Sequence, residues 1–467
     1  MKTSGMRLLA VLLAASLLAA MTGCGRAATP TPLSTEATEA PPTSEPTPVP
    51  EAVRIGVYTV SWSPSSQAMM AELIDMFNEE YSGRIEAEYI QGDWGEGDTY
   101  VSAGVAGGGG IADVVEWWTG GAQEWYEEGF LVDLGPYVTD EVRATMPAEL
   151  WASRTTEDGA VFFSGTVTGE ELVIYYNPAL FEEAGIVPPP SGSTWTWDEF
   201  LANARVLTID ANGKHLGEEG FDANNVVQWG FLPRLDNAKV WEEASTFAMQ
   251  ASGRPMIRRG PDGTWDIFFD EEIMPVLRTY FGVIQEGVTP TLAIGLANES
   301  QDEAFAQGQA AMVLRAYFNI GVLHDRYPDF EFAVMPIPME PGSTYYIDNI
   351  GQGFAVPITS QHPEAAAEFV FWFQRATPQA MWSSALYLAP CNPEALEDPV
   401  LRDDPNWDVM RFYKSIEEVV TIEYNTNQDE FLTTLYAPNM IAVVGGQMTL
   451  DEAIAQITAG SQAILNQ

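Results

Sequence analysis

Short apolar runs with strand character alternate with longer stretches of helical periodicity once the chain passes residue 52. Residues 54–60 are rich in β-branched side chains and predict a first strand, and residues 85–90 alternate as a second strand does. Residues 68–80 place apolar side chains three and four positions apart, which predicts a helix between these strands. Residues 111–115 predict a buried strand. This alternation indicates an α/β fold with largely parallel sheets.

Polar residues at predicted helix starts support the same element order. Thr196 and Thr449 each stand three positions before a glutamate, which is the spacing of a capping box. Asn177 precedes a proline, a pairing typical of an N-cap followed by the first helical residue. A helix with one apolar face follows His362. These features locate helices and do not indicate a function.

The first 24 residues follow a different pattern. Lys2 and Arg7 precede an uninterrupted run of small and apolar residues, which is too short to span a bilayer and predicts a signal peptide over 1–23. The residues before Cys24 resemble a bacterial lipobox, with Met21 where leucine is usual. The resemblance implies that Cys24 is lipidated and anchors the protein to the membrane outside the cytoplasm. The alternative is an ordinary secreted protein that loses Cys24 with its signal.

Residues 24–51 contain mostly proline, threonine, serine, glutamate and alanine. The prolines remove backbone donors and fix φ, so neither a helix nor a sheet propagates there. We therefore expect an extended tether, which would reach about 80 Å in a polyproline conformation. A disordered terminus would behave in the same way.

Composition narrows the function classes. The sequence has 66 acidic and 21 basic residues among 467, giving a net charge of −45, which argues against binding to nucleic acid or adsorption to anionic lipid. The region 52–467 is long enough for two lobes. It holds one cysteine, Cys391, so we expect no disulfide within it, and it has no second apolar run of membrane-spanning length.

Several segments, in this order, resemble extracellular solute-binding protein family 1, the group that contains the maltose-binding protein. They are IADVVEW at 111–117, GFLVDL at 129–134, LVIYYNPALFEEAG at 172–185, TWTWDEF at 194–200, FAQGQAAM at 305–312, GFAVP at 353–357, EAAAEFVFWF at 364–373 and LDEAI at 450–454. The resemblance extends from about residue 53 to the C-terminus.

The resemblance implies a two-lobed, type II periplasmic-binding-protein-like α/β fold, with a ligand cleft between the lobes and a hinge. The first lobe would comprise about 52–166 and 342–386, the second about 170–337 and 392–467, with crossings near 164–169, 336–342 and 389–392. Gly165, Gly169 and Gly342 stand at these crossings, where backbone freedom would serve a hinge. Ligands of open α/β sheets bind beyond the carboxyl ends of the strands.

Four tryptophans follow predicted strands and are candidate ligand contacts. They are Trp62, Trp94, Trp117 and Trp118, each with packing in the core or at the rim as the alternative. Glu170 falls, by the resemblance, where the maltose-binding protein has a carboxylate that binds sugar hydroxyls. The alternative for Glu170 is a solvated acid at a hinge.

Further candidates come from the second lobe and its connections. Residues 312–318 resemble the family stretch that ends in an aromatic facing the ligand, so the stacking residue is either Tyr317 or Phe318, and Arg315 is a candidate donor or an ion-pair partner. The remaining candidates are Asp348 and Asn349, which precede a strand at the second crossing, and Tyr436, which precedes the last helix.

The resemblance implies an extracytoplasmic binding component of an ABC importer that captures a sugar or oligosaccharide and delivers it to permease subunits, without cofactor, metal or catalysis. The alternatives are a polyamine or another solute in the same fold, a secreted glycosidase with paired carboxylates, and a surface adhesin. Neither a nucleophile elbow nor a zinc-protease motif occurs, and the three histidines are scattered. The oxygen-rich stretch from Asp210 to Asp222 is either a surface Asn-Gly turn or a calcium loop.

Overall fold

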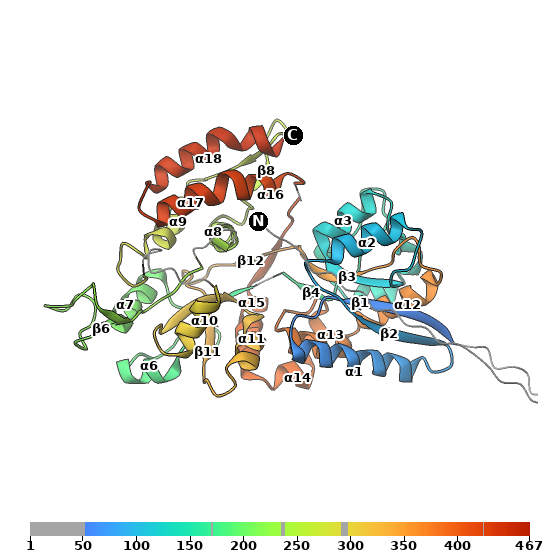
Figure 1. Cartoon of the computed structure of the whole chain (residues 1–467), viewed down its shortest axis with the longest axis horizontal. Helices are drawn as coiled ribbons and strands as arrows, with labels where there is room; N and C mark the ends of the chain where they lie inside the picture. Colours follow the sequence, from blue (N-terminus) through green and yellow to red (C-terminus); the bar gives the residue numbers. More distant parts are fainter. Residues whose placement is uncertain (1–51, 170, 235–238, 291–297, 424) are drawn as a thin grey trace, which may run out of the picture. The chain divides into compact units, whose positions relative to one another are not determined.

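The computed structural model describes residues 52–169, 171–234, 239–290, 298–423 and 425–467 of the chain (Figure 1). These residues belong to one compact unit, Pro50–Gln467. The predicted signal peptide, Cys24, the tether and Glu170 lie outside the described residues.

A five-stranded sheet is built mainly from the first part of the sequence (Figure 1). Its strand order is β2 (Ile85–Gln91), β1 (Val53–Thr59), β3 (Val114–Trp118), β13 (Gly351–Ala355) and β4 (Val167–Thr168). Strands β2 and β3 pair with β1 in parallel, whereas β13 runs antiparallel to both β3 and β4. The three predicted strands of this region are confirmed, with the third beginning three residues later than expected.

Helices pack on both faces of this sheet because each has an apolar stripe that must be buried. They are α1 (Pro64–Glu80), α2 (Gly97–Ala106), α3 (Thr119–Glu127), α12 (Pro363–Phe373) and α13 (Ala376–Leu386), with the short α4 (Asp140–Ala144) and α5 (Ala148–Ala152) between β3 and β4. Phe77 of α1 packs edge-on against Phe369 of α12, with ring centroids 5.0 Å apart. Helix α1 starts four residues earlier than predicted because Ser63 and Ser66 form a capping box.

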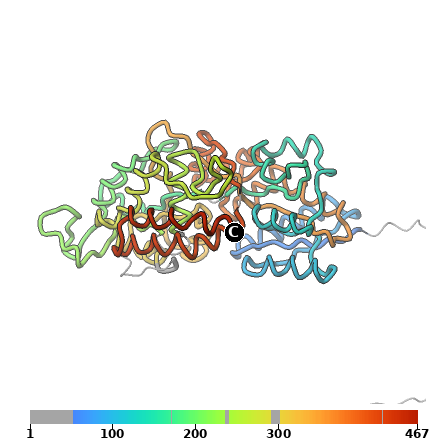
Figure 2. Tube along the Cα trace, turned by 90° about the horizontal axis from the view of Figure 1, so that it is seen from above, coloured from blue at the N-terminus to red at the C-terminus, as the bar shows by residue number. Residues whose placement is uncertain are grey.

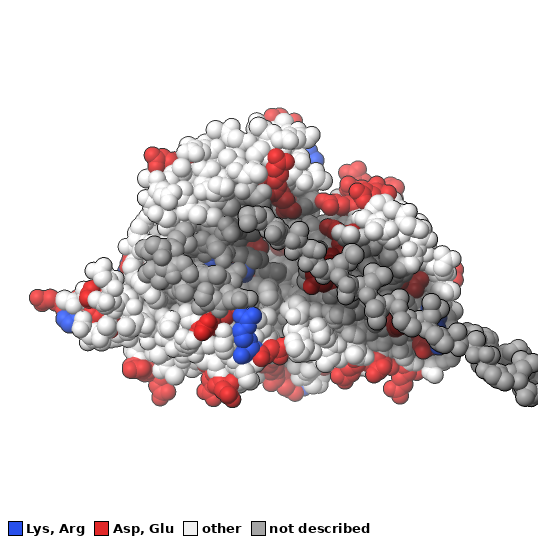
Figure 3. Space-filling model, viewed as in Figure 1, with Lys and Arg blue, Asp and Glu red and all other residues white. Residues whose placement is uncertain are grey.

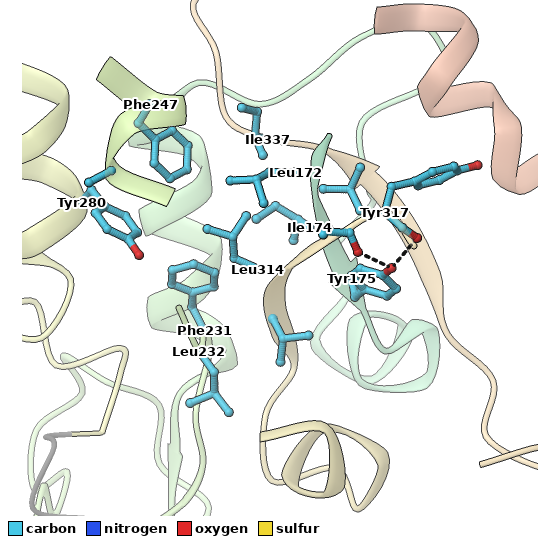
Figure 4. Close-up of a cluster of buried hydrophobic side chains, with 14 of the residues drawn as sticks. Leu172, Ile174, Tyr175, Phe231, Leu232, Phe247, Tyr280, Leu314, Tyr317 and Ile337 are labelled. Carbon is cyan, nitrogen blue, oxygen red and sulfur yellow. Dashed lines mark hydrogen bonds between the residues drawn. The ribbon is translucent and has the colours of Figure 1, made fainter. Parts of the chain in front are cut away.

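A three-stranded sheet forms the centre of the second core. Its order is β10 (Met312–Ala316), β5 (Leu172–Tyr176) and β11 (Ala333–Pro336), and both neighbours run antiparallel to β5. The expectation of largely parallel sheets therefore holds only for part of the molecule. In this core the Tyr175 hydroxyl donates to the carbonyl oxygens of Ala316 and Tyr317, and apolar side chains surround the strands (Figure 4).

Helices and short hairpins complete the second core. They are α6 (Pro178–Ala184), α7 (Trp197–Leu207), α8 (Lys239–Ser252), α9 (Met274–Gly282), α10 (Asn298–Ala306), α11 (Asn319–Arg326), α14 (Pro399–Arg402), α15 (Asp408–Ser415), α16 (Gln428–Phe431), α17 (Ala437–Val444) and α18 (Leu450–Leu465), with the strand pairs β6 (Ile209–Asp210) and β7 (Val226–Gln228), and β8 (Ile257–Arg259) and β9 (Trp265–Ile267). The predicted capping boxes at Thr196 and Thr449 are confirmed.

The chain passes between the two cores more than once. The core of the three-stranded sheet draws residues from 172–347 and again from 380–465, whereas the cores of the five-stranded sheet draw from 55–167 and 354–391. In Figure 2, the orange part of the trace accordingly lies in both halves of the trace. The strands β12 (Tyr345–Asp348) and β14 (Glu417–Val420) pair in parallel beside these passages. Within the described ranges, no helix has the length and apolar character needed to cross a bilayer.

Candidate ligand-binding site

A pocket with a volume of about 730 Å³ lies among residues drawn from both cores. Volumes of this size are typical of sites for small organic ligands. Two of the surfaces that line the pocket carry tryptophans. We call them the first-sheet wall, which contains Trp62, Trp94 and Trp118, and the α8 wall, which contains Trp241, Glu242, Ser245, Thr246 and Met249.

The first-sheet wall is built where parallel strands end. Trp62 follows β1, Trp94 follows β2, and Trp118 is the last residue of β3. Because neighbouring parallel strands end at the same sheet edge, their loops bring these three indoles together. The ring centroids of Trp62 and Trp94 are 6.5 Å apart, and Trp94 is 37% exposed. Three of the predicted tryptophans thus line one pocket.

Trp117 has a different position from its neighbour Trp118. It is 3% exposed, stacks on Trp125 with centroids 5.4 Å apart, and lies behind Trp94 at 4.9 Å. A Cβ atom at Gly97 would come within 2.1 Å of the Trp117 ring, so this glycine makes room for the indole. The structure therefore places Trp117 in the core behind the pocket wall and not among the residues that line it.

The two aromatic candidates that follow β10 also differ in position, because one lines the pocket and the other lies in a core. Phe318 lines the pocket and meets Trp62 edge-on, with centroids 5.8 Å apart. Tyr317 is buried and donates its hydroxyl proton to the carbonyl oxygen of Asn406 at 2.9 Å. Of the two aromatics left open by the sequence, Phe318 is the one that reaches the pocket.

Arg315 lies inside the second core and does not line the pocket. Its Nε donates to the Asp302 Oδ1 at 3.1 Å, and both side chains are less than 10% exposed. Burial lowers the pKa of Arg315, and the adjacent Asp302 carboxylate opposes that shift. The sequence left two roles equally open for Arg315, an ion-pair partner and a donor to the ligand. Its position is that of an ion-pair partner.

Asp348, Asn349 and Tyr436 complete the predicted set. Asp348 lines the pocket, whereas Asn349 is buried and accepts a hydrogen bond from the Ile422 amide at 3.0 Å. Tyr436 is buried beneath Trp241, which it meets edge-on at 4.9 Å between centroids. Tyr436 thus supports a pocket residue from behind.

The α8 wall was missed by the sequence reasoning. Trp241, Ser245 and Met249 are four residues apart and share one face of α8, beside Glu242 and Thr246. Such spacing is typical of a helix face that packs into a core, and no strand end marks it. The one signal for a pocket wall in this part of the sequence was the presence of hydroxyl side chains among the apolar ones on that helix face. Further lining residues come from Pro255, Met256, Ile257, Ile422, Gln428, Asp429 and Leu432.

The charged side chains of the lining are all acidic within the part of the chain that the structure describes. They are Glu242, Asp348 and Asp429. Arg234 lies behind the α8 wall, with its Nη2 3.9 Å from a Glu242 oxygen. Acidic side chains also outnumber basic ones over the face drawn in Figure 3. This balance disfavours an anionic ligand such as a phosphate ester.

A buried carboxyl group adjoins the pocket at the start of β5. Glu171 is 3% exposed, and its Oε1 accepts from the hydroxyl of Thr168, a lining residue, at 2.8 Å. Burial raises the pKa of Glu171 to about 7, although Lys414 favours the charged form. Glu171 therefore fixes the Thr168 hydroxyl at the pocket edge.

The loop from Asp210 to Asp222 has an internal explanation. The Asp210 carboxylate accepts from the backbone amides of Asn212, Lys214 and Asp222. Desolvation works against the charged form, but these donors outweigh it and lower the pKa of Asp210 to about 2. Across the described ranges, no group of three or more His, Cys, Asp or Glu residues is arranged to hold a metal ion. The geometry is that of the turn alternative.

Three solved structures resemble the fold over most of both chains. The cyclic α-maltosyl-1,6-maltose-binding protein of Arthrobacter globiformis is 18% identical, with a TM-score of 0.70 over 89% of this chain and 99% of its own. The GacH receptor of Streptomyces glaucescens, in a study that includes its acarbose complex, is 18% identical, with a TM-score of 0.67 and coverage of 89% and 99%. An ABC substrate-binding protein of Listeria monocytogenes, solved with cycloalternan, is 18% identical, with a TM-score of 0.66 and coverage of 88% and 98%.

These likenesses confirm the predicted two-lobed α/β periplasmic-binding-protein fold. Below, the first lobe means the elements packed on the five-stranded sheet, and the second lobe means those packed on the three-stranded sheet. Curated binding proteins of Brucella abortus and Brucella suis are 25% identical over 219 residues, which is 47% of this chain and 47% of theirs. The chain thus matches about half the length of these relatives. Residues 60–380 match the bacterial extracellular solute-binding protein family, and the chain therefore belongs to that family.

Proposed function

We propose that this protein is the extracytoplasmic substrate-binding component of an ABC importer and that it captures a sugar or oligosaccharide in the pocket between its lobes. The observation that carries this proposal is the lining itself, in which the indoles of Trp62, Trp94, Trp118 and Trp241 are interspersed with hydroxyl, amide and carboxylate groups. A sugar ring has a weakly apolar face that packs on an aromatic ring, while its hydroxyls need donors and acceptors at the edges.

The polar groups of the lining suit neutral hydroxyls. The carboxylates of Glu242, Asp348 and Asp429 accept hydrogen bonds, and those accepted by an ionised group are the stronger ones. The Ser245 and Thr246 hydroxyls and the Gln352 amide both donate and accept. Three neighbours in fold carry cyclic maltosyl-maltose, acarbose or cycloalternan in their names or descriptions, which is consistent with an oligosaccharide in a pocket of about 730 Å³.

Ligand capture would proceed by closure of the lobes. A ligand favours the closed state only through contacts that it makes with both lobes at once. The first-sheet wall and the α8 wall belong to different cores, so a ligand that touches both gains such contacts. The connections near 164–169, 336–342 and 389–392 would serve as the hinge. Gly169 lies at the first of these connections and lines the pocket, where a Cβ would come 3.0 Å from an Asp348 oxygen.

The remaining parts of the proposal concern the cell. Lipidation of Cys24 would anchor the protein to the membrane, the 24–51 segment would act as a tether, and the closed form would be recognised by permease subunits. The net charge of −45 disfavours direct adsorption of the protein to anionic lipid, which leaves the lipid anchor as the attachment. When the protein is produced in a bacterial host, we expect it to incorporate radiolabelled palmitate. The Cys24→Ala variant should not incorporate the label.

The main test is binding to a panel read by calorimetry. The panel contains maltose, maltotriose, cellobiose, xylobiose and raffinose, with spermidine as the non-sugar arm. We expect at least one sugar to bind and to remain chemically intact when the mixture is analysed by chromatography. Binding of spermidine alone would support the polyamine alternative, and release of shorter sugars would support a glycosidase. Absence of any heat from every sugar would contradict the proposal.

A further inference from the structure

The two lobes touch outside the pocket lining, at the N-terminus of α1. The Ser65 hydroxyl of α1 donates to the Asp325 Oδ2 of α11 at 3.2 Å, across 260 positions of the sequence. Ser65 belongs to the first lobe, and Asp325 belongs to the second. Both side chains are exposed, so neither is held by the core of its own lobe.

Helix α1 favours an acidic partner at this position. An α-helix carries a partial positive charge at its N-terminus, which a nearby carboxylate stabilises. The first turn of α1 contains no acidic residue of its own, and Pro64 at its start has no amide hydrogen to donate. The Ser63 hydroxyl caps the Ser66 amide and lies 2.9 Å from that of Ser65. Asp325 thus supplies, from the other lobe, the negative charge that α1 lacks.

The same two elements carry pocket residues. Trp62 lies just before the cap of α1, and Phe318 is the residue directly before α11. Both line the pocket, and their rings meet edge-on at 5.8 Å between centroids. Edge-to-face pairs at this distance are favourable. The Ser65–Asp325 bond therefore joins, near the pocket, the two elements that carry these aromatic residues from opposite lobes.

We infer that Asp325 is a positioning residue for ligand binding, acting through the α1 N-terminus to hold Trp62 and Phe318 in contact in the conformation that binds the ligand. This inference rests on the proposed function. Asp325 is not among the pocket-lining residues, so it acts through the two aromatics and not by contact with the ligand. The exposed site means that the effect is modest and is screened by salt.

The test uses the full chain with Ser65→Ala, Asp325→Asn and the double substitution, and maltotriose as the binding probe. We expect Asp325→Asn to weaken maltotriose binding about threefold, with Ser65→Ala smaller and the double variant no weaker than Asp325→Asn alone. Asp325→Glu keeps the charge and should recover part of the affinity. Asp329→Asn is the matched control, because it removes an exposed aspartate from the same lobe, and it should bind as the unsubstituted chain does.

Salt dependence distinguishes positioning by charge from a general structural effect. Raising ionic strength from about 0.01 to about 0.1 M should weaken binding in the unsubstituted chain more than in Asp325→Asn, because the Debye length shortens about threefold. Unchanged affinity in Asp325→Asn, or equal salt dependence in both proteins, would overturn the inference.

A measurement without ligand separates this inference from the proposed function. In urea unfolding, the losses of stability from Ser65→Ala and Asp325→Asn should be non-additive, since the two side chains share one bond. If maltotriose fails to bind the unsubstituted chain, that result counts against the proposed function. The urea unfolding of the single and double variants then tests by itself whether Ser65 and Asp325 interact. Additive losses would then overturn the inference.

Discussion

The two walls of the pocket are built from different kinds of structure. The first-sheet wall consists of residues at the carboxyl ends of β1, β2 and β3, where a parallel sheet brings neighbouring loops together. The α8 wall is a half-buried face of one helix, and further lining residues lie in segments near residues 256 and 428. The first wall holds three indoles, and the second holds one indole with hydroxyl and carboxylate groups.

This difference explains which residues the sequence could identify. A strand end is visible in the sequence, because the apolar run stops and a loop begins. A helix face that lines a pocket has the same spacing as one that packs into a core, so its function depends on what lies opposite. Residues on the first-sheet wall were therefore predicted, and those on the α8 wall were not. The experiments below test whether the walls also differ in energetic role.

The largest expected effect is on stability and concerns the end of β3. Trp117→Ala should lower the free energy of unfolding by about 3–5 kcal/mol, because it removes a buried indole packed on Trp125. Trp118→Ala is the matched control because the Trp118 indole lines the pocket, and this variant should lose less stability than Trp117→Ala. Chemical denaturation measures both. A Trp117→Ala protein that keeps its stability while losing ligand affinity would mean that Trp117 belongs to the wall.

The second effect concerns pH and a buried carboxyl of β3. Glu116 is 1% exposed and accepts from the Val60 amide, and burial raises its pKa to about 8. The unfolded chain releases this proton near pH 4.5, whereas the folded chain keeps it to about pH 8, so folding binds a proton between these values. Stability should therefore fall as pH rises from about 5 to 8, by about 3.5 kcal/mol for this group.

Glu116→Gln provides the check on that assignment. Glutamine keeps the shape and remains neutral, so the variant should show a flatter dependence of stability on pH over the same range. Glu243 of the second lobe differs from Glu116 in its surroundings. Burial raises the pKa of Glu243 to about 8 as well, but the nearby Arg234 favours the charged form of Glu243. An unchanged pH profile in Glu116→Gln would show that this carboxyl does not hold its proton at neutral pH.

The third effect tests the α8 wall. Trp241→Ala should weaken sugar binding about tenfold, or roughly 1.4 kcal/mol, because it removes the one indole that this wall presents to the ligand. Trp241→Phe should retain part of the affinity, since it keeps an aromatic face against Tyr436. Calorimetric titration with the sugar that binds the unsubstituted chain measures both. Equal binding by all three proteins would assign the ligand to the first-sheet wall alone.

The smallest effect tests the rim of the first-sheet wall. Trp94→Ala should weaken binding about threefold, because the side chain is 37% exposed and its face is shared with Trp62 and Trp117. Its effect on unfolding should be smaller than that of Trp117→Ala. A loss of affinity greater than that of Trp241→Ala would reverse the ranking of the two walls.

Sequence reasoning was most successful where a single local pattern decides the outcome. The strands at 53–59 and 85–91 and the capping boxes at Thr196 and Thr449 follow from periodicity and side-chain chemistry over a few residues. It was least successful for adjacent residues of the same type. Trp117 and Trp118 alternate across β3, so the pleat places one indole in the core and leaves the other at the pocket.

By itself the sequence determined the α/β class, most element positions near the N-terminus and the family resemblance, because these depend on local spacing and composition. Only the tertiary structure decided that β5 lies between two antiparallel neighbours, that Arg315 pairs with Asp302 inside a core, and that a face of α8 lines the same pocket as the first-sheet wall. The physical reason is that each of these depends on segments far apart in the chain, whose meeting is fixed by packing and not by local pattern.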